Sequence, residues 1–166
     1  MKRPGYTTLE CGYISLTQGK LALVSLEDFD FLKQFNWQYD KGYAKRTVCN
    51  AGSKSNVYMH RVVLEQMGFK DFKDTDHINR DRADNRRSNL RPATRTENRR
   101  NIGLQCNNTS GVKGVYWDKK SGKWRAHIRV DGKFIHLGFF DDLQDAISTR
   151  LSAEVKYFGE FRPLAG

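Results

Sequence analysis

The C-terminal third of this chain constrains the fold most, because three strand-like segments are followed there by one long amphipathic segment. The strand-like segments are GVYWDKK, KWRAHIRV and KFIHLGFF, with turn signals at Lys120-Ser121-Gly122 and Asp131-Gly132 between them. The segment that follows has apolar residues at helical spacing, namely Leu143, Ala146, Ile147, Leu151, Val155 and Phe158. Asp142 and Asp145 suit its N-terminus. We therefore expect a three-stranded antiparallel sheet packed on one helix.

The middle strand of this predicted sheet has two chemically different faces, because side chains alternate along a strand. The face expected to pack on the helix carries Trp124, Ala126, Ile128 and Val130. The opposite face carries Arg125, His127 and Arg129, with Tyr116, Phe134 and His136 expected beside them. A basic sheet face of this kind fits the major groove of DNA. The alternative is an ordinary α+β domain with a basic exposed sheet.

Residues 1–59 are predicted to form short strands around one short helix. CGYISLT and KLALVS are separated by the turn signal Gln18-Gly19, and Ser25 precedes the helical segment LEDFDFLKQF. A hairpin is predicted to turn at Asp40-Lys41-Gly42. The strand NVYM and a short helix, HRVVLEQMG, follow, and this helix is expected to end at Gly68.

The chain of 166 residues carries a formal net charge of +10, with a sequence pI of about 9.7. This excess favours a polyanionic partner, and double-stranded DNA is the first expectation. The alternative is a merely basic protein. No lysine occurs between Lys73 and Lys113, whereas arginines crowd this interval. The planar guanidinium suits phosphate oxygens and base edges better than an ammonium group does, which favours the DNA interpretation.

Other features narrow the class of protein. No apolar run approaches the roughly 20 residues of a membrane span, and MKRPGYTTLECGY lacks the apolar core of a signal peptide. We therefore expect a cytoplasmic, intracellular protein with no membrane partner. Cys11, Cys49 and Cys106 form no C-x-x-C pair, so no zinc is expected.

The segment DHINRDRADNRRSNLRPATRTEN, residues 76–98, brings together the residue types that phosphodiester cleavage requires. Asp76 and Asn98 offer oxygen ligands for a hard divalent cation, and a neutral His77 can accept a proton from water. Adjacent residues of a strand point to opposite faces. Asp76 and His77 can therefore flank one phosphate only if the strand ends there, and Asn79-Arg80-Asp81 supplies a turn.

The second half of this segment is expected to support the first. Asn89 is predicted to begin a second short strand and to brace the loop with its amide. Thr94 or Thr96 is expected to cap the helix that carries Asn98 in its first turn. From the residues alone, a metal nuclease and an Asn/Asp/Arg-rich surface loop that binds nothing are about equally supported.

Residues 76–101 resemble the HNH endonucleases of the phage and group-I-intron homing type. Four features carry the resemblance, in this order along the chain: Asp-His-Ile-Asn, a loop rich in Arg and Asn, Asn-Leu-Arg, and an Asn in a helix. The preceding VYMHR looks like the usual lead-in of that family. The resemblance implies a ββα-metal fold in which Asp76 and Asn98 hold one Mg²⁺ or Mn²⁺ ion per active site. It also implies that His77 is the general base and that Asn89 is the middle residue, which holds His77 in place.

Residues 108–160 resemble the plant ethylene-response-factor (APETALA-type) DNA-binding domain in G-V-K-G-V, K-W-R-A-H-I-R and L-G-F-F. That domain binds duplex DNA by its three-stranded sheet. The resemblance implies DNA contacts from Lys113, Tyr116, His127, Arg129 and His136. Arg125 lies on the same face by alternation.

Seven arginines around the Asp-His segment are expected to divide between DNA phosphates and the carboxylates of Asp81, Asp84 and Glu97. They are Arg80, Arg86, Arg87, Arg91, Arg95, Arg99 and Arg100. His60 is expected to be a packed or capping histidine at a strand-to-helix junction. The alternative for His60 is a phosphate contact or a residue that supports the active site.

The predicted fold class is α+β, with a β-rich region at 1–59, a ββα-metal nuclease core at 60–104, a linker at 105–111 and a three-strand-plus-helix DNA-binding domain at 112–166. The predicted function is a divalent-metal-dependent homing endonuclease that hydrolyses a phosphodiester of double-stranded DNA. It would nick one strand as a monomer, and a homodimer remains the alternative. One rival is a non-catalytic DNA-binding regulator that keeps the nuclease scaffold. Another is an RNA-binding module, which the lack of paired RNP-like aromatics disfavours.

Overall fold

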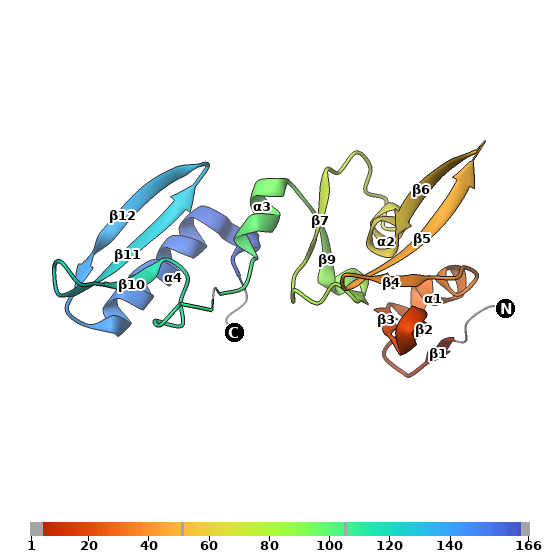
Figure 1. Cartoon of the computed structure of the whole chain (residues 1–166), viewed down its shortest axis with the longest axis horizontal. Helices are drawn as coiled ribbons and strands as arrows, with labels where there is room; N and C mark the ends of the chain where they lie inside the picture. The colour runs from red at the N-terminus through yellow and green to blue at the C-terminus, as the bar shows by residue number, and fades with distance from the viewer. Residues whose placement is uncertain (1–4, 51, 105, 164–166) are drawn as a thin grey trace. The chain divides into compact units, whose positions relative to one another are not determined.

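The computed structural model describes residues 5–50, 52–104 and 106–163, and the chain divides into two compact units, residues 1–95 and 96–166. The α+β class is confirmed, because helices and several separate sheets are mixed along the chain (Figure 1). Within the described ranges, no helix has both the length and the apolar character needed to cross a membrane.

The first unit begins with a four-stranded sheet of order β1-β2-β3-β8. Its strands are β1 (Gly5–Thr7), β2 (Gly12–Ser15), β3 (Leu21–Val24) and β8 (Asp84–Asn85). β2 and β3 run antiparallel around a short 3-10 turn, η1 (Thr17–Gly19), in which Gln18 and Gly19 have positive φ angles, so the predicted turn is confirmed. β8 pairs in parallel with β3, with Leu23 opposite Asp84. The N-terminal strands therefore hold part of the loop that follows the Asp-His pair.

The first helix, α1 (Leu26–Leu32), begins after Ser25 as predicted. It is shorter than the predicted segment, which continued to Phe35. The indole N–H of Trp37 donates to the carbonyl of Leu32 at 2.9 Å, and the helix ends at that carbonyl. Trp37 is fully buried, so the end of α1 at Leu32 coincides with the packing of this ring in the core.

A three-stranded sheet and a second helix complete the framework of the first unit. The strands are β4 (Gln38–Asp40), β5 (Tyr43–Asn50) and β6 (Ser53–Tyr58), all antiparallel. The predicted hairpin turn is confirmed, because Lys41 and Gly42 take φ angles of 50° and 94°. α2 (Met59–Gln66) follows β6 directly, and the N–H of Gly68 donates to the carbonyl of Glu65 just beyond its end.

One hydrophobic core joins the N-terminal region to the segment that carries the Asp-His pair. It includes Val24 of β3, Leu32 of α1, Trp37, Leu64 of α2 and, from much later in the chain, Leu90. Residues 5–50 and 52–66 thus form the scaffold on which the segment around Leu90 is packed.

The second unit contains the predicted sheet and helix. The strands are β10 (Val115–Asp118), β11 (Lys123–Val130) and β12 (Lys133–Phe140), antiparallel in that order, and α4 (Leu143–Phe158) packs on them (Figure 1). Asp142 caps α4 by accepting the N–H groups of Gln144 and Asp145. The predicted packed face is confirmed, because Trp124, Ala126, Ile128 and Val130 all belong to the clusters beneath α4.

The apolar stripe predicted for α4 is wrong at two positions. Leu151 and Val155 are 45% and 56% exposed, whereas the neighbouring Arg150 and Glu154 are buried and form an ion pair at 2.9 Å. A helix turns by about 100° per residue, so the residues one position earlier face a different side. In α4 this different side is the one that packs on the sheet. It therefore buries two charged residues, Arg150 and Glu154, which the apolar periodicity of the sequence does not predict.

Candidate active site

The Asp-His pair lies at the end of a short antiparallel ribbon in the first unit. β7 (Asp74–His77) pairs with β9 (Leu90–Ala93), with Asp76 opposite Arg91 and His77 opposite Leu90 (Figure 1). The N–H of Arg80 donates to the carbonyl of His77 at 2.9 Å, and Arg80 itself has a φ of 68°. The strand therefore ends at His77 in the predicted turn, which allows the side chains of Asp76 and His77 to act near one point.

Asp76 is buried, with only 2% of its surface exposed, and is held by an arginine of the facing strand. The Nε and Nη2 atoms of Arg91 donate to Asp76 Oδ2 at 2.8 and 2.6 Å. Charge-assisted bonds to a guanidinium are short and directional, so they fix the position of this carboxylate. Arg91 was predicted to face DNA, and the structure instead joins it to the predicted metal ligand.

His77 is buried, and burial is the main cause that lowers its pKa. A hydrogen bond with Asn85 and the charges of Asp76, Asp84 and Asp81 act in the opposite direction but do not outweigh burial. His77 is therefore neutral at pH 7, which is the form that a general base requires.

Asn89 connects both sides of the loop that follows His77. It lies in a 3-10 turn, η2 (Arg87–Asn89), and is buried. Its Nδ2 donates to the carbonyl of Asp84 at 2.8 Å, and its Oδ1 accepts the N–H of Asn79 at 2.9 Å. Its own carbonyl accepts the N–H of Ile78. These bonds fix the backbone directly after His77, so Asn89 has the geometry of a bracing residue.

Asp84 is a second buried anchor of the same loop. It accepts Nδ2 of Asn79 at 2.8 Å and both Nε and Nη2 of Arg86, at 2.9 and 2.6 Å. Burial raises the pKa of Asp84, but the hydrogen bonds from Arg86 and Asn79 lower it by more. The predicted pairing of an arginine with Asp84 is confirmed, and it makes Arg86 a structural residue of the loop.

Arg87 pairs with helix α1 rather than with a carboxylate of its own segment. Its Nε and Nη2 donate to the buried Asp28 at 2.9 and 2.7 Å, and its Nη1 forms an ion pair with Glu27. Its backbone N–H donates to Ser25 Oγ. Arg87 therefore ties η2 to the N-terminal region. Of the remaining predicted DNA-binding arginines, Arg80 and Arg95 are exposed, while Arg99 and Arg100 belong to the second unit.

His60 contacts His77, which the sequence did not predict. It lies in the first turn of α2, as expected for a packed histidine at a strand-to-helix junction. Its ring centroid is 5.2 Å from that of His77 at an interplanar angle of 87°, and it stacks on Tyr58 and meets Tyr43 edge-on. Burial, followed by the nearby His77 and Arg61, lowers the pKa of His60 to about 3. The only sequence signal was the VYMHR lead-in.

The buried state of His60 predicts how stability depends on pH. Below its ordinary pKa of about 6.5, the unfolded chain binds a proton that folded His60 does not bind until about pH 3. The free energy of unfolding should therefore fall as pH falls, by about 2 kcal/mol between pH 7 and pH 5 from this group. Denaturant unfolding of the wild type and of His60→Gln at both pH values measures it. The free energy of unfolding should change less between pH 7 and pH 5 in His60→Gln than in the wild type. An equal change in both proteins would contradict the lowered pKa of His60.

The donor chemistry of the predicted metal pair fits a hard divalent cation, because both groups offer oxygen. Asp76 belongs to the first unit and Asn98, in helix α3 (Arg95–Arg100), to the second. Arg91 donates to Asp76 Oδ2, so a cation held by Asp76 would share this carboxylate with the guanidinium. No cluster of three or more His, Cys, Asp or Glu side chains suited to a metal occurs among the described residues.

The predicted DNA-binding residues of the sheet divide into two groups. Strand register places five of them on the face away from α4, namely Tyr116, Arg125, His127, Arg129 and His136. On this face the guanidiniums lie over aromatic rings, with Arg125 5.6 Å from Phe139 and Arg129 5.1 Å from Phe134. Lys113 lies instead before β10, where its Nζ donates to the carbonyl of Arg99.

Comparison with known proteins identifies one segment of the chain. Residues 57–100 match the family described as HNH endonuclease, so this segment is an HNH endonuclease domain. Protein 3.8 of Escherichia phage T7 is 38% identical over 58 residues, which cover 35% of this chain and 48% of that protein. The chain thus spans about half the length of this curated relative. No solved structure matches the chain. The family match ends before residues 108–160, so the ethylene-response-factor resemblance stays a prediction.

Proposed function

We propose that this chain is a divalent-metal-dependent DNA endonuclease of the HNH homing type. One observation carries the proposal: a buried carboxylate, Asp76, and a buried neutral imidazole, His77, end the same strand inside an HNH endonuclease domain. These are the groups that hold a cation and activate water in phosphodiester hydrolysis.

In the proposed reaction, His77 accepts the proton of the water molecule that attacks the scissile phosphate. Asn89 keeps the backbone after His77 fixed through its bonds to Ile78, Asn79 and Asp84. His60 limits rotation of the His77 ring by edge-to-face contact. The attacking oxygen forms a new bond to phosphorus, the bond between phosphorus and one ester oxygen of the strand breaks, and this leaving oxygen takes a proton from solvent water.

Asp76 and Asn98 are proposed to hold one Mg²⁺ or Mn²⁺ ion. β7, β9 and α3 occur along the chain in the order of a ββα-metal core, with β8 and η2 in the loop between the two strands, and this order supports the assignment. When bound, such an ion supplies a positive charge that stabilises the charge developing on the phosphate. With one such site per chain, a monomer would nick one strand, and a double-strand break would need a homodimer or a second event.

The C-terminal sheet is proposed to hold the DNA duplex. Its face away from α4 presents two arginines and two histidines among exposed rings, including Phe134 and Phe139. Arginines in line on a strand suit phosphates and base edges in a major groove. The guanidiniums of Arg86 and Arg87 each give two donors to a buried carboxylate, Asp84 and Asp28 respectively.

One assay distinguishes the proposed nuclease function from that of a non-catalytic DNA-binding regulator. The purified chain is incubated with supercoiled plasmid in Mg²⁺, in Mn²⁺ and in EDTA. Conversion to open circles that depends on the added ion is expected for the nuclease. DNA binding without conversion under every condition would instead favour the regulator.

Binding to DNA is expected to weaken steeply with salt, because cationic contacts to phosphates release counterions. Replacing Arg125, on the open face of the sheet, by glutamine should reduce the slope of log K against log salt by about 1. Fluorescence anisotropy with a labelled duplex at several salt concentrations measures the slope. Lys120→Gln, an exposed change in the β10–β11 turn, should leave it unaltered, and an unchanged slope in Arg125→Gln would contradict the contact.

A further inference from the structure

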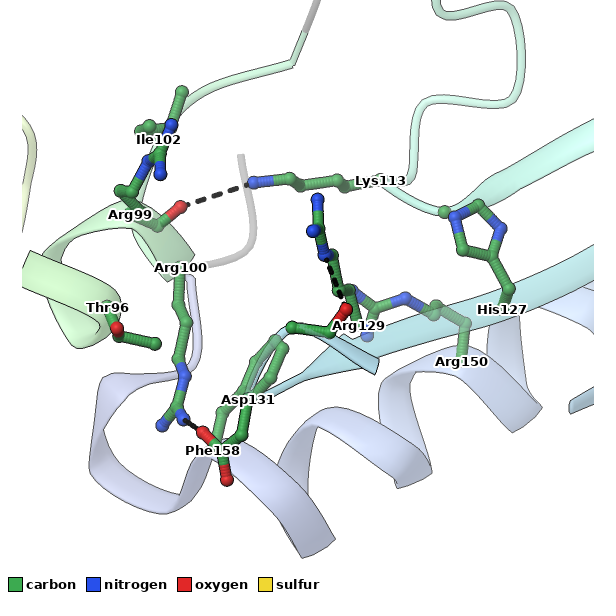
Figure 2. A pocket seen from close by; sticks show the side chains of 12 residues that line it. Thr96, Arg99, Arg100, Ile102, Lys113, His127, Arg129, Asp131, Arg150 and Phe158 are labelled. Carbon is green, nitrogen blue, oxygen red and sulfur yellow. Dashed lines mark hydrogen bonds and ion pairs between the residues drawn. The ribbon is translucent and has the colours of Figure 1, made fainter. Parts of the chain in front are cut away.

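A basic pocket of about 550 Å³ lies within the second unit, and two residues of the open face of the sheet, His127 and Arg129, belong to its lining (Figure 2). Five cationic side chains line it, namely Arg99, Arg100, Lys113, Arg129 and Arg150. The lining contains one carboxylate, Asp131, which lies 3.5 Å from Arg100 Nη2. Even when the buried Glu154 behind Arg150 is included, cations exceed carboxylates by three. An excess of this size inside a concave site attracts an anion.

Arg150 distinguishes this pocket from a solvated basic surface, because only 3% of it is exposed. Its Nη1 lies 2.9 Å from Glu154 Oε1, and its guanidinium lies 5.6 Å from the Phe158 ring centre. Within the described part of the chain, its Nε has no hydrogen-bond partner. A buried guanidinium donor without an acceptor is costly unless a ligand supplies one.

Gly114 makes room for this donor. A Cβ atom at position 114 would lie 2.8 Å from Arg150 Nε and 2.4 Å from the carbonyl oxygen of His127, so no side chain can occupy that space. The backbone there has a φ of 81°, which glycine adopts without strain. Gly114 and Arg150 both line the pocket, so glycine at position 114 leaves room for the buried Nε of Arg150 beside it.

We propose that this pocket binds one phosphate group of a DNA strand, with Lys113, Arg129 and Arg150 donating to its oxygens. Figure 2 shows these three side chains extending toward one space from the segment before β10, from β11 and from α4. Phosphate is favoured over a base, because Arg100 and Arg150 already lie over the Phe158 ring, at 4.9 and 5.6 Å. Assigning the phosphate to DNA rests on the proposed function.

The pocket also connects DNA binding to the proposed metal site. Thr96, Arg99 and Arg100 of α3 line the pocket, and Asn98, the proposed second metal ligand, lies on the same helix. Lys113 already donates to the carbonyl of Arg99 at 3.4 Å. Through this bond, Lys113 links a phosphate in the pocket to α3, the helix that carries Asn98.

The test follows the Nε–H resonance of Arg150 by NMR in the full chain with ¹⁵N-labelled arginine, in EDTA. The resonance is assigned by its loss in Arg150→Lys. Thymidine 5′-monophosphate, its methyl phosphodiester and plain thymidine are titrated separately. We expect a saturable shift with the phosphates and none with thymidine. A shift with the diester assigns an internal phosphate of the strand, and a shift with the monoester alone assigns a strand end.

Two charge-matched variants make the result decisive. Lys113→Gln should weaken phosphate binding about tenfold through loss of one charge-assisted bond, whereas Lys119→Gln, exposed and outside the lining, should not change it. No saturable shift, or equal weakening by both variants, would overturn the inference. Because no metal is present, the outcome is independent of cleavage: a chain that binds phosphate but never nicks DNA would refute only the proposed nuclease function.

Discussion

Replacing His77 by alanine is expected to slow DNA cleavage by between about 10² and 10⁴ fold, the usual contribution of a positioned general base. His77 is buried and neutral, and its backbone is fixed by the turn to Arg80. Removing the imidazole leaves water without a proton acceptor at that point. Duplex affinity should be retained, because the proposed DNA-holding residues lie on the C-terminal sheet.

The measurement is a single-turnover cleavage rate with protein in excess over a labelled duplex, paired with an affinity measurement in EDTA. Lys119→Ala is the control, because Lys119 is exposed and takes part in no contact argued above. A thermal unfolding curve shows whether His77→Ala remains folded. Cleavage by the folded variant at nearly the wild-type rate would remove His77 from the role of base.

Asp76→Asn is expected to lower the free energy of unfolding by about 3 kcal/mol, a large effect for an isosteric change. Asp76 and Arg91 form a largely buried ion pair, with side chains 2% and 13% exposed. Loss of one partner leaves the other charge buried without compensation, which is strongly destabilising. Urea unfolding at pH 7 measures the change.

Two further variants test this interpretation. Asp76→Asn combined with Arg91→Gln removes both charges and should recover part of the lost stability. Asp30→Asn breaks the exposed pair of Asp30 with Lys33 and should have no measurable effect. If Asp76→Asn lowered the free energy of unfolding no more than Asp30→Asn does, the ion pair of Asp76 with Arg91 would not stabilise the fold.

The local structure of both units was largely predictable, because its signals lie close together in sequence. The turns at Gln18-Gly19, Lys41-Gly42 and Asp131-Gly132 need positive φ angles, and the sequence places suitable residues there. The end of β7 at His77 followed from the Asn79-Arg80-Asp81 turn. The burial of Arg150 and Glu154 was not predictable, because an ion pair at i and i+4 ordinarily lies on a solvated helix face.

The residues of the candidate site were predictable from the sequence, but the side chains with which they form ion pairs and contacts were not. Asp76, His77 and Asn89 were chosen for their chemistry, and that choice needed no long-range information. Arg91 reaches Asp76 across 15 residues and Arg87 reaches Asp28 across 59, so their partners depend on how the strands and α1 pack. The contact of His60 with His77 likewise arises only once α2 and β7 are folded together.

The proposed role of Asp76 is to serve a divalent-metal-dependent cleavage site. It is tested most directly by the single-turnover cleavage rate as a function of Mg²⁺ concentration, for the wild type and Asp76→Asn at saturating protein and at a temperature where both are folded. We predict a wild-type rate that is zero in EDTA and saturates with Mg²⁺, and a variant rate that stays at background throughout. Cleavage in EDTA, or the same Mg²⁺ dependence in both chains, would contradict this role of Asp76.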